Sequence, residues 1–316
     1  MKKNLIFRIL GNDLQDLHGN NQTLKNLEFT LKNEEEFPDT EKMYLLNRIY
    51  DLSKKNKILE LLNRYDYKHI DLPFSMDEFK KIEYPRGIDT KINNYLHRQE
   101  SRIWLINYIK YILGTEKKIR SCFFKKLYAF NMYMININGA RNFCLNYGKN
   151  NGYEWIFVLD SNAYFTHELF NNVIDNIKEN TEYICIPQIR LSENNFKNEQ
   201  LLNEPINFNS FIHREPQIAF KNTSKLKFNE KIPYGTAEKA ELLRVLQVPG
   251  PWDTWNDNEL YIGIKDRKIE NVKYQILSKV IRLNSHNSKN NITDNFTKRI
   301  AGLNYLINEI KSNCNG

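Results

Sequence analysis

Residues 139–166, GARNFCLNYGKNNGYEWIFVLDSNAYFT, form the stretch that decides the fold. The pattern predicts a helix over 140–147, a polar turn around Gly152 and then a buried strand over the apolar run 154–159. Asp160 follows where this strand ends. The carboxyl ends of strands in an α/β sheet border the crevice in which such sheets bind ligands. The stretch therefore predicts an acidic side chain at the mouth of a ligand site.

The chain before this stretch alternates between strand and helix patterns. Short apolar or β-prone runs predict strands at 4–10, 43–49 and 68–74, and helical repeats predict helices at 20–36 and 54–65. Such an alternation indicates a parallel sheet with right-handed crossovers. We therefore expect an α/β fold, with a Rossmann-like, mostly parallel sheet flanked by helices.

The rest of the chain completes a single predicted domain over residues 1–316, with a helical insertion at 75–126. Further strands are expected at 127–137, 183–191, 217–220 and 273–283, and further helices at 166–179, 237–246 and 293–312. Thr166 is a suitable N-cap for the first of these helices. The last helix is amphipathic, and its spacing says only that one face packs on the core, a partner or a membrane.

The composition suits a folded protein with anionic ligands. The chain is 41% hydrophobic and 13% aromatic, and its net charge of +8 favours polyanions such as nucleotide diphosphates or anionic lipids. No zinc-finger, basic-zipper or RNP signature indicates nucleic acid. Four widely spaced cysteines without C-x-x-C, no signal peptide and no run of 18 apolar residues predict a cytoplasmic protein. The basic segment 116–126 is expected to contact an anionic membrane peripherally.

Two motifs together, G-A-R-N-x-x-L and the strand-end L-D-x-[DN], resemble the family 2 glycosyltransferases and their GT-A relatives. The resemblance implies a nucleotide-sugar-dependent glycosyltransferase, in which a strand-end Asp-x-Asp holds a divalent metal on the donor diphosphate. Carried over to this sequence, it implies that Asp160 and Asn162 bind Mn²⁺ or Mg²⁺, with Arg141 near the phosphates. His286, after the last predicted strand, is a further expected metal ligand or diphosphate contact.

Asn162 stands where the second acid of the Asp-x-Asp triplet is expected. Its carbonyl oxygen can still coordinate a hard cation, but one formal charge is lost. Three interpretations stay open: weaker metal binding, metal-independent transfer, or a metal ligand elsewhere in the chain.

The nucleotide is expected to lie over the ends of the first two strands. In GT-A proteins the loop after the first strand lies under the nucleotide, which implies donor contacts for Arg8, Asn12 and Asp13. Asp51 ends the second predicted strand, where the family places an acid that binds the nucleobase.

The acceptor side is expected further along the chain. Trp252 and Asp253 lie in the Gly/Pro-rich segment 249–257, where an indole provides a platform for a sugar ring and a carboxylate can deprotonate a hydroxyl group. Asp253 fits the position of the catalytic base in inverting family 2 enzymes. Glu215 competes for that role, and Arg214 beside it is an expected phosphate ligand.

These expectations define a sugar transferase acting on a glycan, lipid-linked or polysaccharide acceptor. Inversion at the anomeric carbon is implied by the family alone. Two alternatives compete with this interpretation. A nucleotidyltransferase would share the sheet architecture, but residues 8–13 lack the Gly-rich, Lys/Arg-bearing loop of that class. A catalytically decayed GT-A-like binding module is the other, and Asn162 is its best support.

Overall fold

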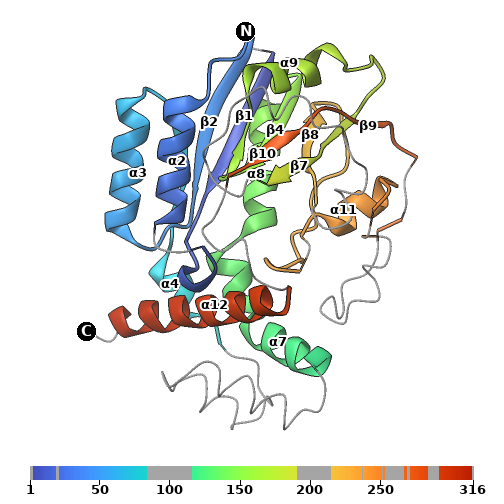
Figure 1. Ribbon diagram of the computed structural model, residues 1–316. Coiled ribbons are helices and arrows are strands. Elements are labelled where there is room, and N and C mark those ends of the chain that lie inside the picture. Colours follow the sequence, from blue (N-terminus) through green and yellow to red (C-terminus); the bar gives the residue numbers. More distant parts are fainter. Residues whose placement is uncertain are drawn as a thin grey trace.

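A mixed sheet of seven strands crosses the centre of the computed structural model (Figure 1). Its strands, in spatial order, are β3 (Lys68–Leu72), β2 (Thr40–Asn47), β1 (Asn4–Leu10), β4 (Trp155–Asp160), β8 (Gln217–Lys221), β6 (Tyr183–Ile186) and β9 (Tyr274–Ile276). Strand β8 runs antiparallel to β4 and β6, and the other neighbours are parallel. This arrangement confirms the predicted α/β class, a Rossmann-like fold with a mostly parallel sheet flanked by helices.

The structure describes residues 3–18, 21–83, 116–190, 215–236, 238–250, 252, 267–268, 271–283 and 292–314. Three expected site residues, Arg214, Asp253 and His286, lie outside this set. So do residues 84–115 of the expected insertion.

Helices cover both faces of the sheet. They are α1 (Gln15–His18), α2 (Gln22–Asn33), α3 (Leu52–Arg64), α4 (Met76–Lys80), α7 (Glu116–Met134), α8 (Ile137–Asn150), α9 (His167–Asp175), α11 (Ala240–Val245) and α12 (Ile292–Cys314). As predicted, Thr166 caps α9, because its hydroxyl group accepts a hydrogen bond from the Leu169 amide at 3.2 Å.

Strands β1 and β4 form the middle of the core. All seven residues of β1 are buried, as expected of a parallel strand covered on both faces. Alternate residues divide between two hydrophobic clusters. Phe7 and Val158 face the cluster that includes α8 and α11, whereas Ile6 and Phe157 face the cluster that includes α9.

The strand expected at 127–137 is wrong, because this segment is helical and contains the end of α7 and the start of α8. Its aromatic residues favour a strand on propensity alone. Tertiary packing decides otherwise: Leu127, Phe130 and Met134 have helical spacing and are buried in one cluster with residues of α12. Asn136, with a φ of 43°, separates the two helices.

Two of the expected strands are each divided. The segment 183–191 forms β6 in the large sheet and β7 (Gln188–Arg190) in a small sheet, with Pro187, which has no N–H to donate, between them. The segment 273–283 forms β9 and β10 (Val280–Arg282), separated at Ser278, whose φ is 50°. The small sheet has the order β5 (Ala163–Tyr164), β10, β7.

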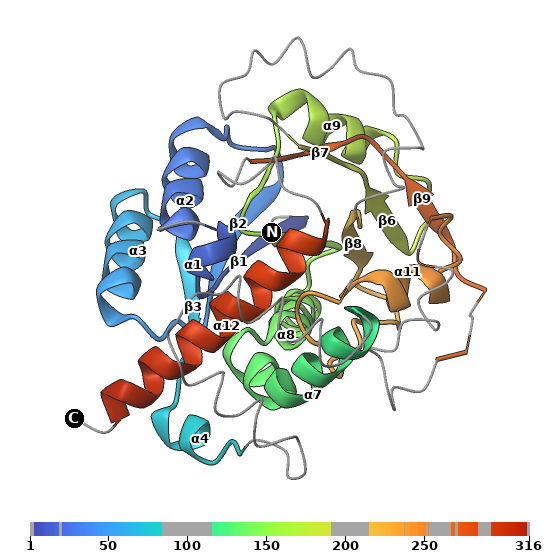
Figure 2. The same ribbon diagram turned by 60° about the horizontal axis from the view of Figure 1, so that its bottom comes forward.

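Helix α12 lies across α1 and α7 (Figure 2). Its residues Ile300, Leu303, Ile307 and Ile310 are buried at helical spacing against α7, so its apolar face packs on this chain. In α7, Lys126 is likewise only 1% exposed. No helix in the described part of the chain combines the length and apolarity that crossing a membrane requires.

Candidate active site around Asp160

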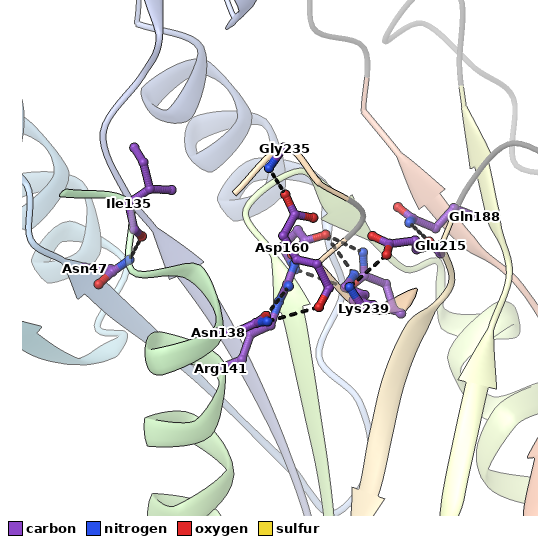
Figure 3. A network of polar contacts seen from close by, with 11 residues as sticks. Asn47, Ile135, Asn138, Arg141, Asp160, Gln188, Glu215, Gly235 and Lys239 are labelled. Atoms are coloured by element: carbon purple, nitrogen blue, oxygen red, sulfur yellow. Dashed lines mark hydrogen bonds and ion pairs between the residues drawn. The ribbon is translucent and has the colours of Figure 1, made fainter. Parts of the chain in front are cut away.

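Asp160 lies at the carboxyl end of β4, and its carboxylate is held between two cations. Oδ1 accepts a hydrogen bond from Arg141 Nη2 at 2.7 Å. Oδ2 accepts from Lys239 Nζ at 3.0 Å and from Gln217 Nε2 at 2.9 Å. The Asp160 side chain is 24% exposed, whereas those of Arg141 and Lys239 are 3% and 2% exposed. Figure 3 shows the network, with Arg141 on α8 pointing to the strand end.

Close helix–strand packing brings Arg141 to this position. A Cβ atom on Gly148 would lie 2.4 Å from Ile156, so only glycine allows α8 to approach β4 so closely. Arg141 lies two turns earlier on α8 and therefore reaches the end of the strand. Its Nη1 also donates to Asn138 Oδ1 at 2.9 Å, which fixes the guanidinium group.

Lys239 and Gln217 close the network from the other side. Gln217 begins β8, whose antiparallel direction places its first residue beside the last residues of β4. Lys239 precedes α11, and its Nζ donates to Gln217 Oε1 at 3.1 Å as well as to Asp160. Burial alone would raise the pKa of Asp160, but Lys239 and Arg141 outweigh it and hold that pKa well below its ordinary value. Asp160 is therefore ionised at neutral pH.

Glu215 lies beside this network. Its Oε1 accepts a hydrogen bond from the Lys239 amide at 2.8 Å, and its carbonyl oxygen accepts one from the Gln188 side chain. Burial and the charge of Glu238 raise the pKa of Glu215 to about 7, although Lys239 and Arg141 oppose the shift. A carboxyl group with a pKa near neutrality is suited to accept a proton in a reaction.

Two further arginines add positive charge at this edge. Arg299 of α12 donates through Nη1 to the Gly235 carbonyl at 3.2 Å and lies over the Tyr234 ring. Arg282 pairs with Ala163 in the small sheet, just after the Asp160–Asn162 turn. In the described part of the chain, the buried Nε atoms of Arg141, Arg282 and Arg299 have no hydrogen-bond acceptor. Such donors are costly unless a ligand or water satisfies them.

The structure thus brings together three of the expected residues: Asp160 and Arg141 directly, and Glu215 through Lys239. Asn162 lies close by in sequence, and its carbonyl oxygen accepts from the Leu283 amide at 2.9 Å. The described residues contain no group of three His, Cys, Asp or Glu side chains that could hold a metal ion.

The expected nucleotide contacts after β1 and β2 lie at the same edge of the sheet but already have protein partners. Asp13 accepts from Lys54 Nζ at 2.8 Å, and Asn12 donates to the carbonyl oxygens of Arg48 and Met134. Asp51 caps α3 by accepting from the Lys54 amide at 3.0 Å. These contacts join the ends of the strands to the surrounding helices.

Arg8 and Trp252 lie in the interior. Arg8 is 1% exposed, forms an ion pair with Glu34 at 2.5 Å and donates to the Ala163 carbonyl at 3.0 Å. Trp252 is 3% exposed, and its indole N–H donates to the Val248 carbonyl. The ring packs over Gly250, where a Cβ atom would lie 2.1 Å from it. These contacts give both side chains a packing role.

Lys239 and Gln217 were not among the residues predicted from the sequence. Neither belongs to a recognisable motif, and each lies far along the chain from Asp160. The available signal was positional: Gln217 begins an expected strand, and Lys239 lies near the start of an expected helix. Only the strand order, with β8 antiparallel beside β4, brings them to the same edge.

Comparisons with known proteins give only distant likenesses. No protein-family model and no curated protein sequence matches the chain. Among solved structures, S. aureus TarS 1-349 aligns at 12% identity and a TM-score of 0.39, covering 89% of this chain and 60% of that one. A second S. aureus TarS structure aligns at 12% identity and a TM-score of 0.38, covering 90% and 37%.

The mannosyltransferase Ktr4p from S. cerevisiae aligns at 13% identity and a TM-score of 0.22, covering 58% of this chain and 38% of that one. This chain therefore spans less than two thirds of each of these proteins. Likenesses with TM-scores this low carry no argument about activity.

Proposed function

We propose that this protein is a glycosyltransferase that uses a nucleotide-sugar donor. The observation that carries the proposal is the position of Asp160 between Arg141 and Lys239 at the carboxyl end of β4. This edge is where α/β sheets bind their ligands. The resemblance of the surrounding motifs to family 2 glycosyltransferases supplies the reaction class.

The charge of the site supports a diphosphate-containing donor. Transfer from a nucleotide sugar breaks the bond between the anomeric carbon and a phosphate oxygen, so negative charge accumulates on the departing diphosphate. Arg141 and Lys239 exceed the charge of Asp160 by one, and buried cations interact strongly with an anion because water screens them little. Hydrogen-bond donors that the fold already holds beside the charge formed in the transition state lower the barrier of such a reaction.

Glu215 is the proposed base. It would take the proton from an acceptor hydroxyl group while that oxygen forms its bond to the anomeric carbon and the nucleotide diphosphate leaves. The Lys239 amide holds its carboxylate at 2.8 Å beside the proposed donor site. Attack opposite the leaving group would invert the anomeric configuration. The proposed acceptor is a glycan, a lipid-linked sugar or a polysaccharide.

The first test is the thermal stability of the full chain against UDP, GDP, CMP and dTDP, followed by turnover of the matching nucleotide sugars. One nucleotide is expected to raise the Tm, because a ligand that binds only the folded state stabilises it. Asp160→Asn should reduce turnover without abolishing the stabilisation, because Arg141 and Lys239 stay as cations but lose the carboxylate that fixes them. Asp175→Asn, which changes an exposed acid at the end of α9, should affect neither. Absence of stabilisation by any nucleotide would contradict the proposal.

The base is tested separately by Glu215→Gln. We expect the kcat of transfer to fall by about 10²–10⁴-fold, the usual contribution of a positioned base, while stabilisation by the nucleotide persists. Unchanged transfer by Glu215→Gln would exclude Glu215 and favour Asp253.

A second candidate is a GT-A-like binding module without turnover, which Asn162 favours because an acid is expected there. Stabilisation by a nucleotide without turnover of any donor, with or without Mn²⁺, would support this alternative over the transferase.

A further inference from the structure

We propose that Lys239, paired with Arg141 across Asp160, holds the donor diphosphate in the place that a divalent metal ion takes in the Asp-x-Asp enzymes. The inference rests on the proposed function and concerns the same site. It makes donor binding by this chain independent of Mn²⁺ or Mg²⁺.

The donor set around Asp160 does not suit a divalent cation. Hard cations require several oxygen ligands with negative charge among them. Asp160 is the one carboxylate of the expected triplet, and Asn162 adds no charge. Both Asp160 oxygens already accept hydrogen bonds from cationic side chains, at 2.7 Å from Arg141 and 3.0 Å from Lys239. A metal ion there would be repelled by two fixed positive charges.

Lys239 has the geometry to serve an anion instead. An ammonium group carries three N–H donors. Those of Lys239 meet Asp160 Oδ2 and Gln217 Oε1, and no third acceptor contacts them within the residues that the structure describes. Arg141 likewise has a buried Nε without an acceptor there. The two cations come from different elements, α8 and the start of α11, so they converge on Asp160 from two sides.

The surrounding charges also favour an anion. Arg282 and Arg299 add two cations at this edge, and their buried Nε atoms have no acceptor among the described residues. The opposing carboxylates are Asp160, Glu215 and Glu238, which interact electrostatically with Arg141.

Each of the three carboxylates has a defined partner. Asp160 is paired, Glu215 accepts from the Lys239 amide, and Glu238 accepts from the Gly235 amide. The four cations, namely Arg141, Lys239, Arg282 and Arg299, exceed the three acids by one positive charge, which favours a bound diphosphate. Lys239 and Arg141 would stabilise the diphosphate as its bond to the anomeric carbon breaks.

The experiment compares metal-stripped protein in EDTA with the same protein in Mn²⁺ or Mg²⁺. The readouts are the Kd of the nucleoside diphosphate found in the panel and the turnover of its sugar conjugate. We expect EDTA to change both less than twofold. We expect Lys239→Met to weaken nucleotide binding at least tenfold and Lys239→Arg to restore part of it. Lys149→Met is the matched control, because this partly buried lysine donates to the Ser224 carbonyl at the far end of α8.

Circular dichroism and Tm establish whether each variant is folded. If Lys239→Met does not fold, Lys239→Arg still tests the role of the ammonium group. Loss of nucleotide binding in EDTA with recovery in Mn²⁺ would overturn this inference and leave the transferase standing. Nucleotide binding by Lys239→Met equal to that of the wild type would also overturn it. Failure of every nucleotide to bind, under all metal conditions, would instead contradict the proposed function itself.

Discussion

Arg141 Nη2 and Asp160 Oδ1 lie 2.7 Å apart although 19 positions separate the two residues in the chain. The short turn between α8 and β4 reverses the chain direction, and Gly148 allows the helix to lie directly on the strand. The pair is therefore produced by one local unit of helix, turn and strand. Lys239 joins it from 79 positions away. The site thus combines a local ion pair with a distant second cation.

Arg141→Met tests how much the ion pair contributes to folding. The change removes a 3% exposed cation and leaves Asp160 with Lys239 as its only charged partner among the described contacts. Breaking a buried pair typically costs 3–5 kcal/mol, and residual pairing to Lys239 should reduce this to about 2–3 kcal/mol of unfolding free energy. Urea denaturation measures the loss.

Arg64→Met is the control for this prediction, because Arg64 forms an exposed pair with Glu60 on α3. Such surface pairs contribute less than about 1 kcal/mol. An equal loss of stability in the two variants would contradict the buried character of the Arg141–Asp160 pair.

Gly148→Ala tests the packing that positions Arg141. The new Cβ atom would lie 2.4 Å from Ile156, so α8 must move away from β4 or Ile156 must change its conformation. Overpacking of this kind costs about 1–3 kcal/mol. We expect that loss in urea denaturation, together with weaker nucleotide binding because Arg141 shifts with its helix.

Gly11→Ala is the matched glycine change, since a Cβ atom there would lie 3.9 Å from the nearest atom, the Asn47 carbonyl oxygen. It should change stability by less than about 0.5 kcal/mol. Unaltered stability of Gly148→Ala would show that the helix does not depend on this close contact.

Glu215 predicts a pH dependence of stability. Its pKa is raised from 4.5 to about 7 in the folded protein, so the folded state retains the proton over a range in which the unfolded state has lost it. The favourable contribution is complete below about pH 4.5 and is lost as the pH rises through about 7. The unfolding free energy of the wild type should therefore fall relative to that of Glu215→Gln across this window, by up to about 3 kcal/mol.

Denaturation at pH 5 and at pH 8 measures this difference. Glu154→Gln, which alters a partly exposed acid at the start of β4, is the control and should follow the wild type. If the wild type and Glu215→Gln keep a constant difference between the two pH values, Glu215 does not titrate in this range.

The sequence predicted those parts of the fold and site that local patterns determine. The apolar run of β1, interrupted only by Arg8, and that of β4 indicate buried strands, and the acid that ends β4 was expected at the carboxyl edge of the sheet. The strand expected at 127–137 failed because Phe130 and its neighbours suit a strand by propensity, whereas their helical spacing buries them in one cluster with residues of α1, α4 and α12. Lys239 could not be found because its place depends on strand β8 lying antiparallel to β4.

A double variant, Asn162→Asp with Lys239→Met, tests whether lysine and metal are alternatives at this site. The change removes one cation from Asp160 and supplies a second carboxylate at the Asp-x-Asp spacing, so the donor set becomes one that suits Mn²⁺. We expect nucleotide binding to be weak in EDTA and to recover at least tenfold with Mn²⁺, measured by titration calorimetry. Lys239→Met alone should not recover, because it lacks the second acid. Asn162→Asp alone should bind the nucleotide without metal, because Lys239 remains. Equal responses of the double variant and Lys239→Met to Mn²⁺ would show that the ammonium group and a metal ion do not substitute for each other.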